Sequence, residues 1–446
     1  MSSHLTIIGA GLAGSEAAWQ AAEAGVPVVL YEMRPERPTP VHKTGNCAEL
    51  VCSNSMGSNQ DPSAPFLLKQ ELRKLDSLII RSADRHAVPA GKALAVDRNL
   101  FSGEITRILE QHPNITLRHE EVVDIPTEGP VIIATGPLTS PALFEKLSHL
   151  LGQDCLYFYD ALSPILDAHS IDYEKTFFAS RYGKGGADYL NCGLNREQYE
   201  TFVDELLKAE KVPLKEFEKP KYFEGCMPIE VLADRGRQTL AFGPLKPVGL
   251  HHPETNERFH AVVQLRKENK EGTAYNLVGF QTKLTYPEQR RIFRTIPGLE
   301  NAEFFRLGAI HRNTYIDAPQ LLSGDLSLKS HPNIFFAGQI VGVEGYVESS
   351  AMGLIASLSA MARLQGTALI SPPAETAIGA LLKYVTGKEG NYQPMNINFG
   401  LFSGPEMRVR DKKTRNQNIV RRALEMQEKW LADLEGIKQY RRPKPA

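Results

Sequence analysis

The stretch Leu5-Thr6-Ile7-Ile8-Gly9-Ala10-Gly11-Leu12-Ala13-Gly14 decides the fold of this chain. Its apolar beginning predicts a β-strand, and the G-x-G-x-x-G spacing that follows is typical of a turn leading from a strand into a helix beside a dinucleotide. Gly9 permits the tight turn, Gly11 lets the backbone approach a pyrophosphate, and Gly14 lets the helix pack closely on the strand. The stretch therefore predicts a nucleotide-binding domain.

The residues around this turn strengthen the prediction. An alanine-rich segment over residues 12–24 predicts the helix, Gly25 is suited to end it, and residues 28–31 predict a second strand. Glu32 lies 23 residues after Gly9 (32 − 9), where a carboxylate can accept hydrogen bonds from the hydroxyls of an adenosine ribose. This position favours NAD or FAD over NADP, and the alternative is a glycine-rich turn that binds no ligand.

Composition limits the class of protein. The 446 residues suffice for two or three domains, and 51 Lys and Arg against 52 Asp and Glu indicate neither nucleic acid nor a membrane surface as a partner. No apolar run approaches the roughly 18 residues of a membrane helix, and the N-terminus has no leader pattern, so we expect a soluble, cytoplasmic protein. Without a C-x-x-C pair or zinc-ligand spacing, we expect no disulfide framework and no metal. The five cysteines are Cys47, Cys52, Cys155, Cys192 and Cys226.

A second glycine-rich unit lies far from the first. Residues 131–137 predict a strand buried on both faces that ends in a Thr135-Gly136 turn. Residues 334–337 predict a further strand, followed by three glycines and by a small-residue helix at 348–363. This arrangement offers a second helix N-terminus to a ligand. A helix that only packs tightly is the alternative interpretation of this unit.

Two nucleotide-facing units on one sheet suit a long cofactor that lies extended across it, so FAD is a better candidate than NAD. We expect an α/β fold in which a Rossmann-type FAD-binding domain, residues 1–140 and 330–446, carries an inserted α+β domain for the substrate or tRNA at residues 141–329. The residues predicted to contact the cofactor are Gly9, Ala10, Gly11, Leu12, Ala13, Gly14, Glu32, Thr135, Gly136, Gly338, Gln339 and Tyr346.

Six motifs distributed along the chain carry a resemblance to a known family. They are residues 9–14, 47–55 (CAELVCSNS), 223–230 (FEGCMPIE), 279–284 (GFQTKL), 311–314 (HRNT) and 337–340 (AGQI) with 342–353. Through them the chain resembles, over nearly its whole length, the folate- and FAD-dependent tRNA (uracil-5-)-methyltransferases. That family is related to the large subunit of the enzyme that installs a carboxymethylaminomethyl group on the tRNA wobble uridine.

The resemblance implies methylation of the T-loop uridine at tRNA position 54. In this family 5,10-methylenetetrahydrofolate supplies the carbon, FADH2 the reducing equivalents, and NAD(P)H reloads the flavin. The chemistry is consistent, because methylation at uracil C5 needs a nucleophile at C6, a one-carbon donor and a hydride. The family's two motif cysteines correspond to Cys52 and Cys226, and Gly225 and Pro228 favour a turn that presents the Cys226 thiol. Which cysteine attacks C6 stays open, and the remaining cysteines are interpreted as structural.

Three further features are candidates for substrate contacts. The ring of Tyr346 can stack on a flavin or a flipped base, or fill the core. The cluster His311-Arg312-Asn313 can bind folate or the uracil edge, or form a structural network. Residues 401–446 hold 12 Lys or Arg and 6 Asp or Glu, which suits tRNA phosphates, although a solvated surface helix is equally compatible. The predicted tRNA contacts there are Arg408, Arg410, Arg421 and Arg422.

Three other functions compete with the methyltransferase. The wobble-uridine family carries a long additional C-terminal helical region, whereas this sequence continues for only about eighty residues after Arg363 (446 − 363). An NAD(P)H-dependent flavin oxidoreductase remains possible in versions that need no C-x-x-C pair. A non-catalytic flavoprotein that binds RNA would leave two motif cysteines without a role. We expect tRNA and folate as partners, no membrane, and no obligate protein partner.

Overall fold

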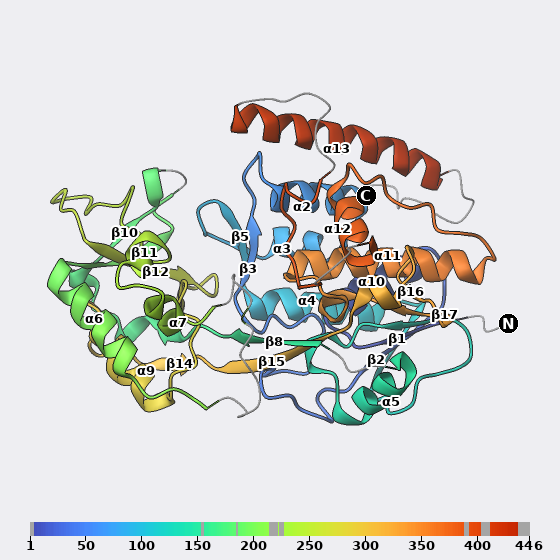
Figure 1. Cartoon of the computed structure of the whole chain (residues 1–446), viewed down its shortest axis with the longest axis horizontal. Coiled ribbons are helices and arrows are strands. Elements are labelled where there is room, and N and C mark those ends of the chain that lie inside the picture. The colour runs from blue at the N-terminus through green and yellow to red at the C-terminus, as the bar shows by residue number, and fades with distance from the viewer. Residues whose placement is uncertain are drawn as a thin grey trace.

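The computed structural model contains two six-stranded sheets with different strand directions (Figure 1). The structure describes residues 4–152, 156–183, 186–213, 222, 227–387, 392–402 and 411–435. The first sheet lies with the blue and orange elements of Figure 1, and the second lies with the green and yellow elements to its left. The α/β fold class with an additional α+β region is therefore confirmed.

The first sheet is parallel except at one edge. Its strands in spatial order are β16 (Ser327–Leu328), β17 (His331–Phe336), β7 (Val131–Ile133), β1 (Leu5–Ile8), β2 (Val28–Glu32) and β6 (Ile115–His119). Ile8 is aligned with Tyr31 of β2 on one side and with Ile133 of β7 on the other, and only β16 runs antiparallel to its neighbour. All four residues of β1 are buried, as the continuous apolar run of a central parallel strand requires.

Two helices that follow the glycine-rich units pack directly against each other. They are α1 (Leu12–Glu23) and α11 (Tyr346–Leu364). A Cβ added to Gly353 would lie 2.1 Å from the Ala13 carbonyl oxygen, so the close approach of the helices requires glycine there. The Ser357 hydroxyl donates to the Ala17 carbonyl oxygen at 2.9 Å. The small residues of both helices thus bring their N-termini to the same edge of the sheet.

Further helices complete the layers around the first sheet. They are α2 (Ala64–Lys74), α3 (Leu78–Arg85), α4 (Arg98–Gln111), α5 (Pro141–Leu151), α10 (Ala318–Leu321), α12 (Ala377–Gly387) and α13 (Lys412–Glu435). Helix α13 lies along the outside of α2 and α12 (Figure 1). One continuous apolar core joins these elements, and it draws on residues 5–151 and 315–434.

The second sheet is antiparallel and has its own core. Its strands in spatial order are β10 (Thr176–Ala179), β11 (Tyr189–Leu194), β12 (Ala261–Lys267), β13 (Ala274–Leu277), β9 (Ile165–Asp167) and β14 (Phe304–Arg306). Its helices are α6 (Arg196–Lys208), α7 (Ile229–Asp234), α8 (Thr239–Phe242) and α9 (Tyr286–Phe293). The apolar core here is formed by residues between 166 and 302. The division into domains at residues 1–140 with 330–446, and 141–329, stays a prediction.

Two smaller sheets and several 3-10 helices complete the described structure. The strands are β3 (Ser55–Ser58), β5 (Ala93–Val96) and β4 (Ala87–Val88) in one sheet, and β15 (Ile310–Tyr315) and β8 (Leu156–Ala161) in the other. The 3-10 helices are η1 (Gly136–Leu138), η2 (Ala168–Ser170), η3 (Tyr173–Lys175), η4 (Arg181–Gly183) and η6 (Gly338–Val341). Strand β17 begins three residues before the predicted strand and α11 two residues before the predicted helix.

Candidate functional site

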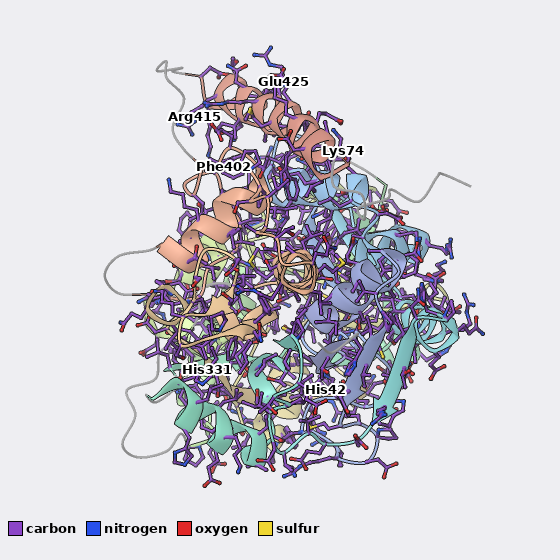
Figure 2. All side chains as sticks on the ribbon, turned by 90° about the vertical axis from the view of Figure 1, so that its right-hand side faces the viewer. His42, Lys74, His331, Phe402, Arg415 and Glu425 are labelled. Carbon is purple, nitrogen blue, oxygen red and sulfur yellow. The ribbon has the colours of Figure 1, made fainter. Side chains whose placement is uncertain are left out.

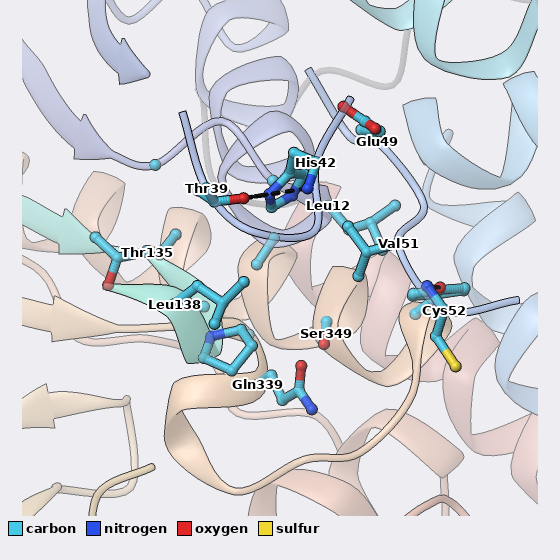
Figure 3. A pocket seen from close by; sticks show the side chains of 18 of the residues that line it. Leu12, Thr39, His42, Glu49, Val51, Cys52, Thr135, Leu138, Gln339 and Ser349 are labelled. Carbon is cyan, nitrogen blue, oxygen red and sulfur yellow. Dashed lines mark hydrogen bonds between the residues drawn. The ribbon is translucent and has the colours of Figure 1, made fainter. Parts of the chain in front are cut away.

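A cavity of about 530 Å³ lies at the carboxyl ends of β1, β2 and β7, beside the N-termini of α1 and α11 (Figure 3). This edge is where ligands bind in parallel α/β sheets. Ten of the twelve predicted cofactor residues line the cavity, whereas Ala10, in the turn, and Gly14, in α1, do not. The ten are Gly9, Gly11, Leu12, Ala13, Glu32, Thr135, Gly136, Gly338, Gln339 and Tyr346.

The three glycines of the first turn have separate physical tasks. Gly9 has a φ of +99°, and a Cβ there would lie 2.6 Å from the Ala134 carbonyl oxygen. A Cβ on Gly14 would lie 1.8 Å from the Gly9 carbonyl oxygen. Gly11 instead faces open space, with no heavy atom within 4 Å of an added Cβ. The turn therefore has the shape that lets a pyrophosphate approach the backbone at the start of α1.

Glu32 ends β2 and turns its carboxylate toward this turn. Its Oε2 accepts a hydrogen bond from the Ala10 amide at 3.1 Å, and its Oε1 accepts from the Arg34 amide at 3.0 Å and from Arg34 Nε at 2.8 Å. Burial opposes ionisation, but the hydrogen bonds and charge of Arg34, with the Ala10 amide, hold the pKa of Glu32 below its ordinary value. An ionised carboxylate on the cavity wall fits the hydroxyls of a ribose.

The second glycine-rich unit closes the cavity from the other side. Gly338 has a φ of +82°, and a Cβ there would lie 2.8 Å from the Ala13 side chain. Gly136 has a φ of +66° and faces open space. Thr135 and Thr139 share a hydrogen bond of 2.6 Å between their hydroxyls. The two units therefore form one wall, which fits a cofactor extended along it.

Cys52 lies on the same wall, in the loop between β2 and β3 (Figure 3). Its amide donates to the Tyr346 hydroxyl oxygen at 2.8 Å, and the Ser53 amide donates to the same oxygen at 3.2 Å. The Cys52 Sγ lies 3.9 Å from the Ala161 carbonyl oxygen of β8. Burial raises the pKa of Tyr346 above its ordinary value, so its hydroxyl stays protonated. Tyr346 thus lines the cavity and also orders the cysteine loop.

Two arginines hold the carbonyl side of this loop. Arg98 Nη2 and Arg306 Nη2 each donate to the Cys52 carbonyl oxygen at 2.9 Å. Arg306 Nη1 also donates to the Val51 carbonyl oxygen at 2.9 Å, and Arg98 forms an ion pair with Glu268. Because both sides of Cys52 are hydrogen-bonded, the loop presents its thiol from a fixed backbone. Neither arginine stood out in the sequence, since their partners are backbone atoms of distant segments.

Several more ionisable residues line the cavity and were missed, among them His42, Asp160 and Glu344. His42 Nδ1 lies 2.6 Å from Thr39 Oγ1, and burial together with the charge of Arg34 lowers the pKa of His42 to about 4 (Figure 3). Asp160 and Glu344 bring two carboxyl groups to the wall near Cys52. A lone histidine in a proline-rich loop and two carboxylates 184 positions apart (344 − 160) carry no local pattern that could have identified them.

The predicted substrate residues are only partly described. In β15, His311 is aligned with Asp160 of β8, and the side chains of His311 and Arg312 lie outside the described residues. Asn313 is buried and donates to Asp160 Oδ2 at 3.4 Å, so it touches a residue of the cavity wall. Cys226, Arg408 and Arg410 lie outside the described residues.

The other described cysteines are buried. Burial raises the pKa of Cys47 to about 12 and raises that of Cys192 as well. Both are free thiols, each covered by the apolar core of its own region. These properties suit a structural role. Cys155 lies outside the described residues.

Helix α13 lies on the surface away from the second sheet (Figure 1). Its buried side includes Trp430, whose Nε1 donates to the Ile370 carbonyl oxygen at 2.8 Å. Figure 2 shows Arg415 and Glu425 on this helix, above Lys74 of α2. Arg422 pairs with Glu375 at 2.9 Å, and Arg421 Nη2 donates to Asn418 Oδ1 at 3.5 Å. The basic side chains of α13 are thus solvent-facing and partly engaged within the protein.

No metal cluster or membrane span is found in the part of the chain that the structure describes. Groups of three or more His, Cys, Asp or Glu side chains able to hold a metal ion are absent from these residues. None of the described helices combines the length and the apolar character needed to cross a bilayer.

Comparison with known proteins agrees with this architecture. The family model for glucose inhibited division protein A matches residues 4–368. In solved structures, the chain is similar to GidA of Aquifex aeolicus in its form I crystal, with a TM-score of 0.69 and 19% identity over 97% of this chain and 78% of that chain. This second similarity supports the fold.

Curated relatives are far closer in sequence. The methylenetetrahydrofolate–tRNA-(uracil-5-)-methyltransferase TrmFO of Aquifex aeolicus is 57% identical over 433 residues, which cover 97% of each chain. The protein of the same name from Heliobacterium modesticaldum is 58% identical over 430 residues, which cover 96% of this chain and 98% of the relative. The resemblance drawn from the six motifs is therefore confirmed. The chain belongs to the glucose inhibited division protein A family and, within it, to the methylenetetrahydrofolate–tRNA-(uracil-5-)-methyltransferases.

Proposed function

We propose that this protein methylates C5 of the T-loop uridine at tRNA position 54, with 5,10-methylenetetrahydrofolate as carbon donor and FAD, reloaded by NAD(P)H, as reductant. One observation carries the proposal: a dinucleotide turn and the Cys52 thiol line the same cavity in a chain 57% identical to a folate-dependent tRNA uracil methyltransferase. Bound FAD supplies the reducing equivalents that turn a methylene into a methyl group.

The cavity wall supports FAD as the cofactor. The open space at Gly11 and the start of α1 suit the pyrophosphate, and the ionised Glu32 suits the adenosine ribose. The wall then continues past Gly136 and Gly338 to Tyr346 and Cys52. A cofactor with two nucleotide-like ends fits a wall that contains both glycine-rich units better than a single nucleotide would.

Cys226 is our candidate for the nucleophile that attacks uracil C6, and Cys52 for a second thiol at the reacting end of the cofactor. Cys226 itself lies outside the described residues, but its described neighbours contact segments of the cavity wall. Tyr222 forms a bridge with Tyr159 of β8, and the Ile229 amide donates to the Gln281 carbonyl oxygen at 2.7 Å. Gln281 lines the cavity, and Tyr159 precedes Asp160, which also lines it.

The remaining substrate contacts follow from the same geometry. We assign folate and the uracil edge to the β15 residues His311, Arg312 and Asn313, because that strand lies beside Asp160 of the wall. We assign tRNA phosphates to the basic C-terminal segment. Its predicted contacts are Arg408, Arg410, Arg421 and Arg422. The region at residues 141–329 would then serve as the substrate domain.

Nucleoside analysis by mass spectrometry tests the proposal. The purified protein is incubated with an unmodified tRNA transcript, methylenetetrahydrofolate and NAD(P)H, in parallel with Cys226→Ala and with Cys192→Ala as a control cysteine outside the cavity. We expect 5-methyluridine from the wild type and from Cys192→Ala, and none from Cys226→Ala. Oxidation of NAD(P)H without methylated uridine would instead support the flavin oxidoreductase.

A further inference from the structure

Glu344 is held firmly at the cavity wall, between η6 and α11. Its amide donates to the Met395 carbonyl oxygen at 3.0 Å, and its own carbonyl oxygen accepts from Asn396 Nδ2 at 2.8 Å. The carboxyl Oε2 accepts from Gln339 Nε2 at 2.8 Å. The residue is 7% exposed and still lines the cavity. A carboxyl group that is buried and still lines a ligand cavity is a candidate for a functional group.

The surroundings of Glu344 keep its proton in place. Burial raises the pKa of Glu344 well above its ordinary value, and the neighbouring Asp160 carboxyl on β8 raises it further. Cys52 on its loop and Glu348 on α11 act in the same direction, whereas the Gln339 hydrogen bond opposes them. Two adjacent carboxyl groups in a low dielectric retain one proton between them. Burial and the neighbouring carboxyl group therefore favour the protonated form of Glu344.

No basic side chain described next to Glu344 lowers its pKa back to the ordinary value. Glu348 is itself buried and accepts from the Ile397 amide at 3.0 Å. Lys69, the cation that acts on Glu348, donates to the Met56 carbonyl oxygen at 2.9 Å. Tyr346 is engaged with the amides of Cys52 and Ser53. The cavity thus combines a thiol, a neutral carboxylic acid and an adjacent acidic partner within one wall.

A neutral acid is what the first chemical step of uracil methylation requires. When a cysteine thiolate adds to C6, its sulfur forms a bond to carbon and the C5–C6 π electrons move toward the C4 carbonyl. Negative charge then develops on O4, and a proton donor placed there lowers the barrier. We propose that Glu344, which lines the cavity together with Cys52, is this donor, and that Asp160 on the same wall is its positioning residue. The proposal rests on the proposed function.

The step balances without a further reactant. The Glu344 O–H bond breaks, its proton moves to O4, and the electron pair of that bond remains on the Glu344 carboxylate. The nucleophile supplies the electrons of the new S–C6 bond, and C5 becomes the nucleophilic carbon of an enol. Return of the proton from O4 to Glu344 accompanies the reverse reaction or the attack of C5 on the one-carbon unit.

Formation of a covalent complex with tRNA that contains 5-fluorouridine isolates this step from methyl transfer. We measure its rate on denaturing gels across pH for the wild type, Glu344→Gln and Asp160→Asn. Glu71→Gln, a buried carboxyl that caps α12 outside the cavity, serves as the matched control. Bound FAD and thermal unfolding are recorded for each variant, and methylation of ordinary tRNA is measured in parallel with the wild type.

The wild-type rate is expected to fall at high pH, as Glu344 loses its proton. Glu344→Gln is expected to slow the step by about 10- to 100-fold and to abolish this fall, because an amide donates without titrating. Asp160→Asn removes the adjacent negative charge, lowers the pKa of Glu344, and shifts the fall to lower pH. If Glu344→Gln loses FAD, the Asp160→Asn profile decides the question.

Unchanged rates and pH profiles in both variants would overturn the proposal, as would a wild type that forms no covalent complex. If the wild type methylates tRNA and both variants form the covalent complex with 5-fluorouridine tRNA at the wild-type rate, only the role of Glu344 is wrong. If the wild type does not methylate tRNA at all, the proposed function itself fails.

Discussion

At the level of single residues, Tyr346 links the second glycine-rich unit to the cysteine loop. Its hydroxyl oxygen accepts from the amides of Cys52 and Ser53, so Tyr346→Phe leaves two N–H groups without that acceptor. We expect the free energy of unfolding to fall by about 1 kcal/mol and Cys52 to react several-fold faster with iodoacetamide. Thermal unfolding and peptide mass spectrometry measure the two effects.

The control for this prediction is Tyr384→Phe on α12, whose hydroxyl donates to the Gln393 carbonyl oxygen away from the cavity wall. It removes the same atom and should leave the reactivity of Cys52 unchanged. Equal alkylation rates in wild type and Tyr346→Phe would show that the tyrosine does not order the loop.

The residues predicted from sequence share a local signature. Gly9, Gly11 and Glu32 follow a spacing set by one strand–turn–helix unit, so their positions at the cavity could be predicted. Glu344 and Arg306 could not, because their roles depend on partners from other parts of the chain. Asp160 on β8 lies 184 positions before Glu344 (344 − 160), and Arg306 lies 254 positions after Cys52 (306 − 52), so only the folded chain brings these residues together.

At the level of helices and strands, the contact between α1 and α11 tolerates no side chain at Gly353. An alanine Cβ would lie 2.1 Å from the Ala13 carbonyl oxygen, which is a backbone atom that cannot rotate away. We expect Gly353→Ala to destabilise the protein by about 1–3 kcal/mol and to reduce its FAD content, because both helix N-termini would shift. Thermal unfolding and the flavin absorbance of the purified protein measure this.

Gly103→Ala in α4 provides the contrast. No heavy atom lies within 4 Å of its added Cβ, so alanine there should stabilise the helix by about 0.5–1 kcal/mol. A Gly353→Ala protein that unfolds at the wild-type temperature and keeps its flavin would refute the packing argument.

The N-terminus of α12 predicts an unusual pH dependence of stability. The buried Glu71 carboxyl accepts from the amides of Ala377 and Ile378, and burial raises its pKa to about 8. Because the folded state retains this proton between about pH 4.5 and about 8 while the unfolded state releases it, stability from this group falls as pH rises through that window.

Glu71→Gln removes this titration. Relative to the wild type, the variant should therefore gain stability between about pH 5 and about 8, as measured by thermal unfolding at each pH. The exposed Glu36→Gln is the control and should track the wild type. A constant difference between Glu71→Gln and wild type across this range would mean that Glu71 is already ionised in the folded protein.

The elements themselves were predictable where one pattern determined them. The apolar runs at β1 and β7 predicted strands, the second of them buried on both faces, and the small residues of α11 predicted a helix. The three-stranded sheet of β3, β5 and β4 was not anticipated, because these strands are two to four residues long and depend on pairing between segments about forty residues apart.

At the level of the whole molecule, tRNA binding should depend on the charge of α13. Double substitution of Arg421 and Arg422 by alanine should weaken tRNA binding and reduce the slope of log affinity against log salt by about one for each phosphate that is no longer neutralised. Titrations at several salt concentrations measure this slope. Arg107→Ala, an exposed arginine on α4 outside both the C-terminal segment and the region at 141–329, is the control. Identical slopes for the double variant and wild type would place the tRNA on another surface.

The proposed reaction requires that the methylene carbon of the folate be transferred to uracil C5 and reduced by the flavin in one cavity. Following the carbon itself is the sharpest measurement: the protein is given unmodified tRNA, methylenetetrahydrofolate labelled with ¹³C in its methylene group, and NAD(P)H, and the tRNA nucleosides are analysed by mass spectrometry. We expect 5-methyluridine that is heavier by about one mass unit than the unlabelled nucleoside, because its methyl carbon comes from the folate. Reduced flavin without labelled 5-methyluridine would show that the protein does not transfer the folate carbon to uracil, and would contradict the proposed function.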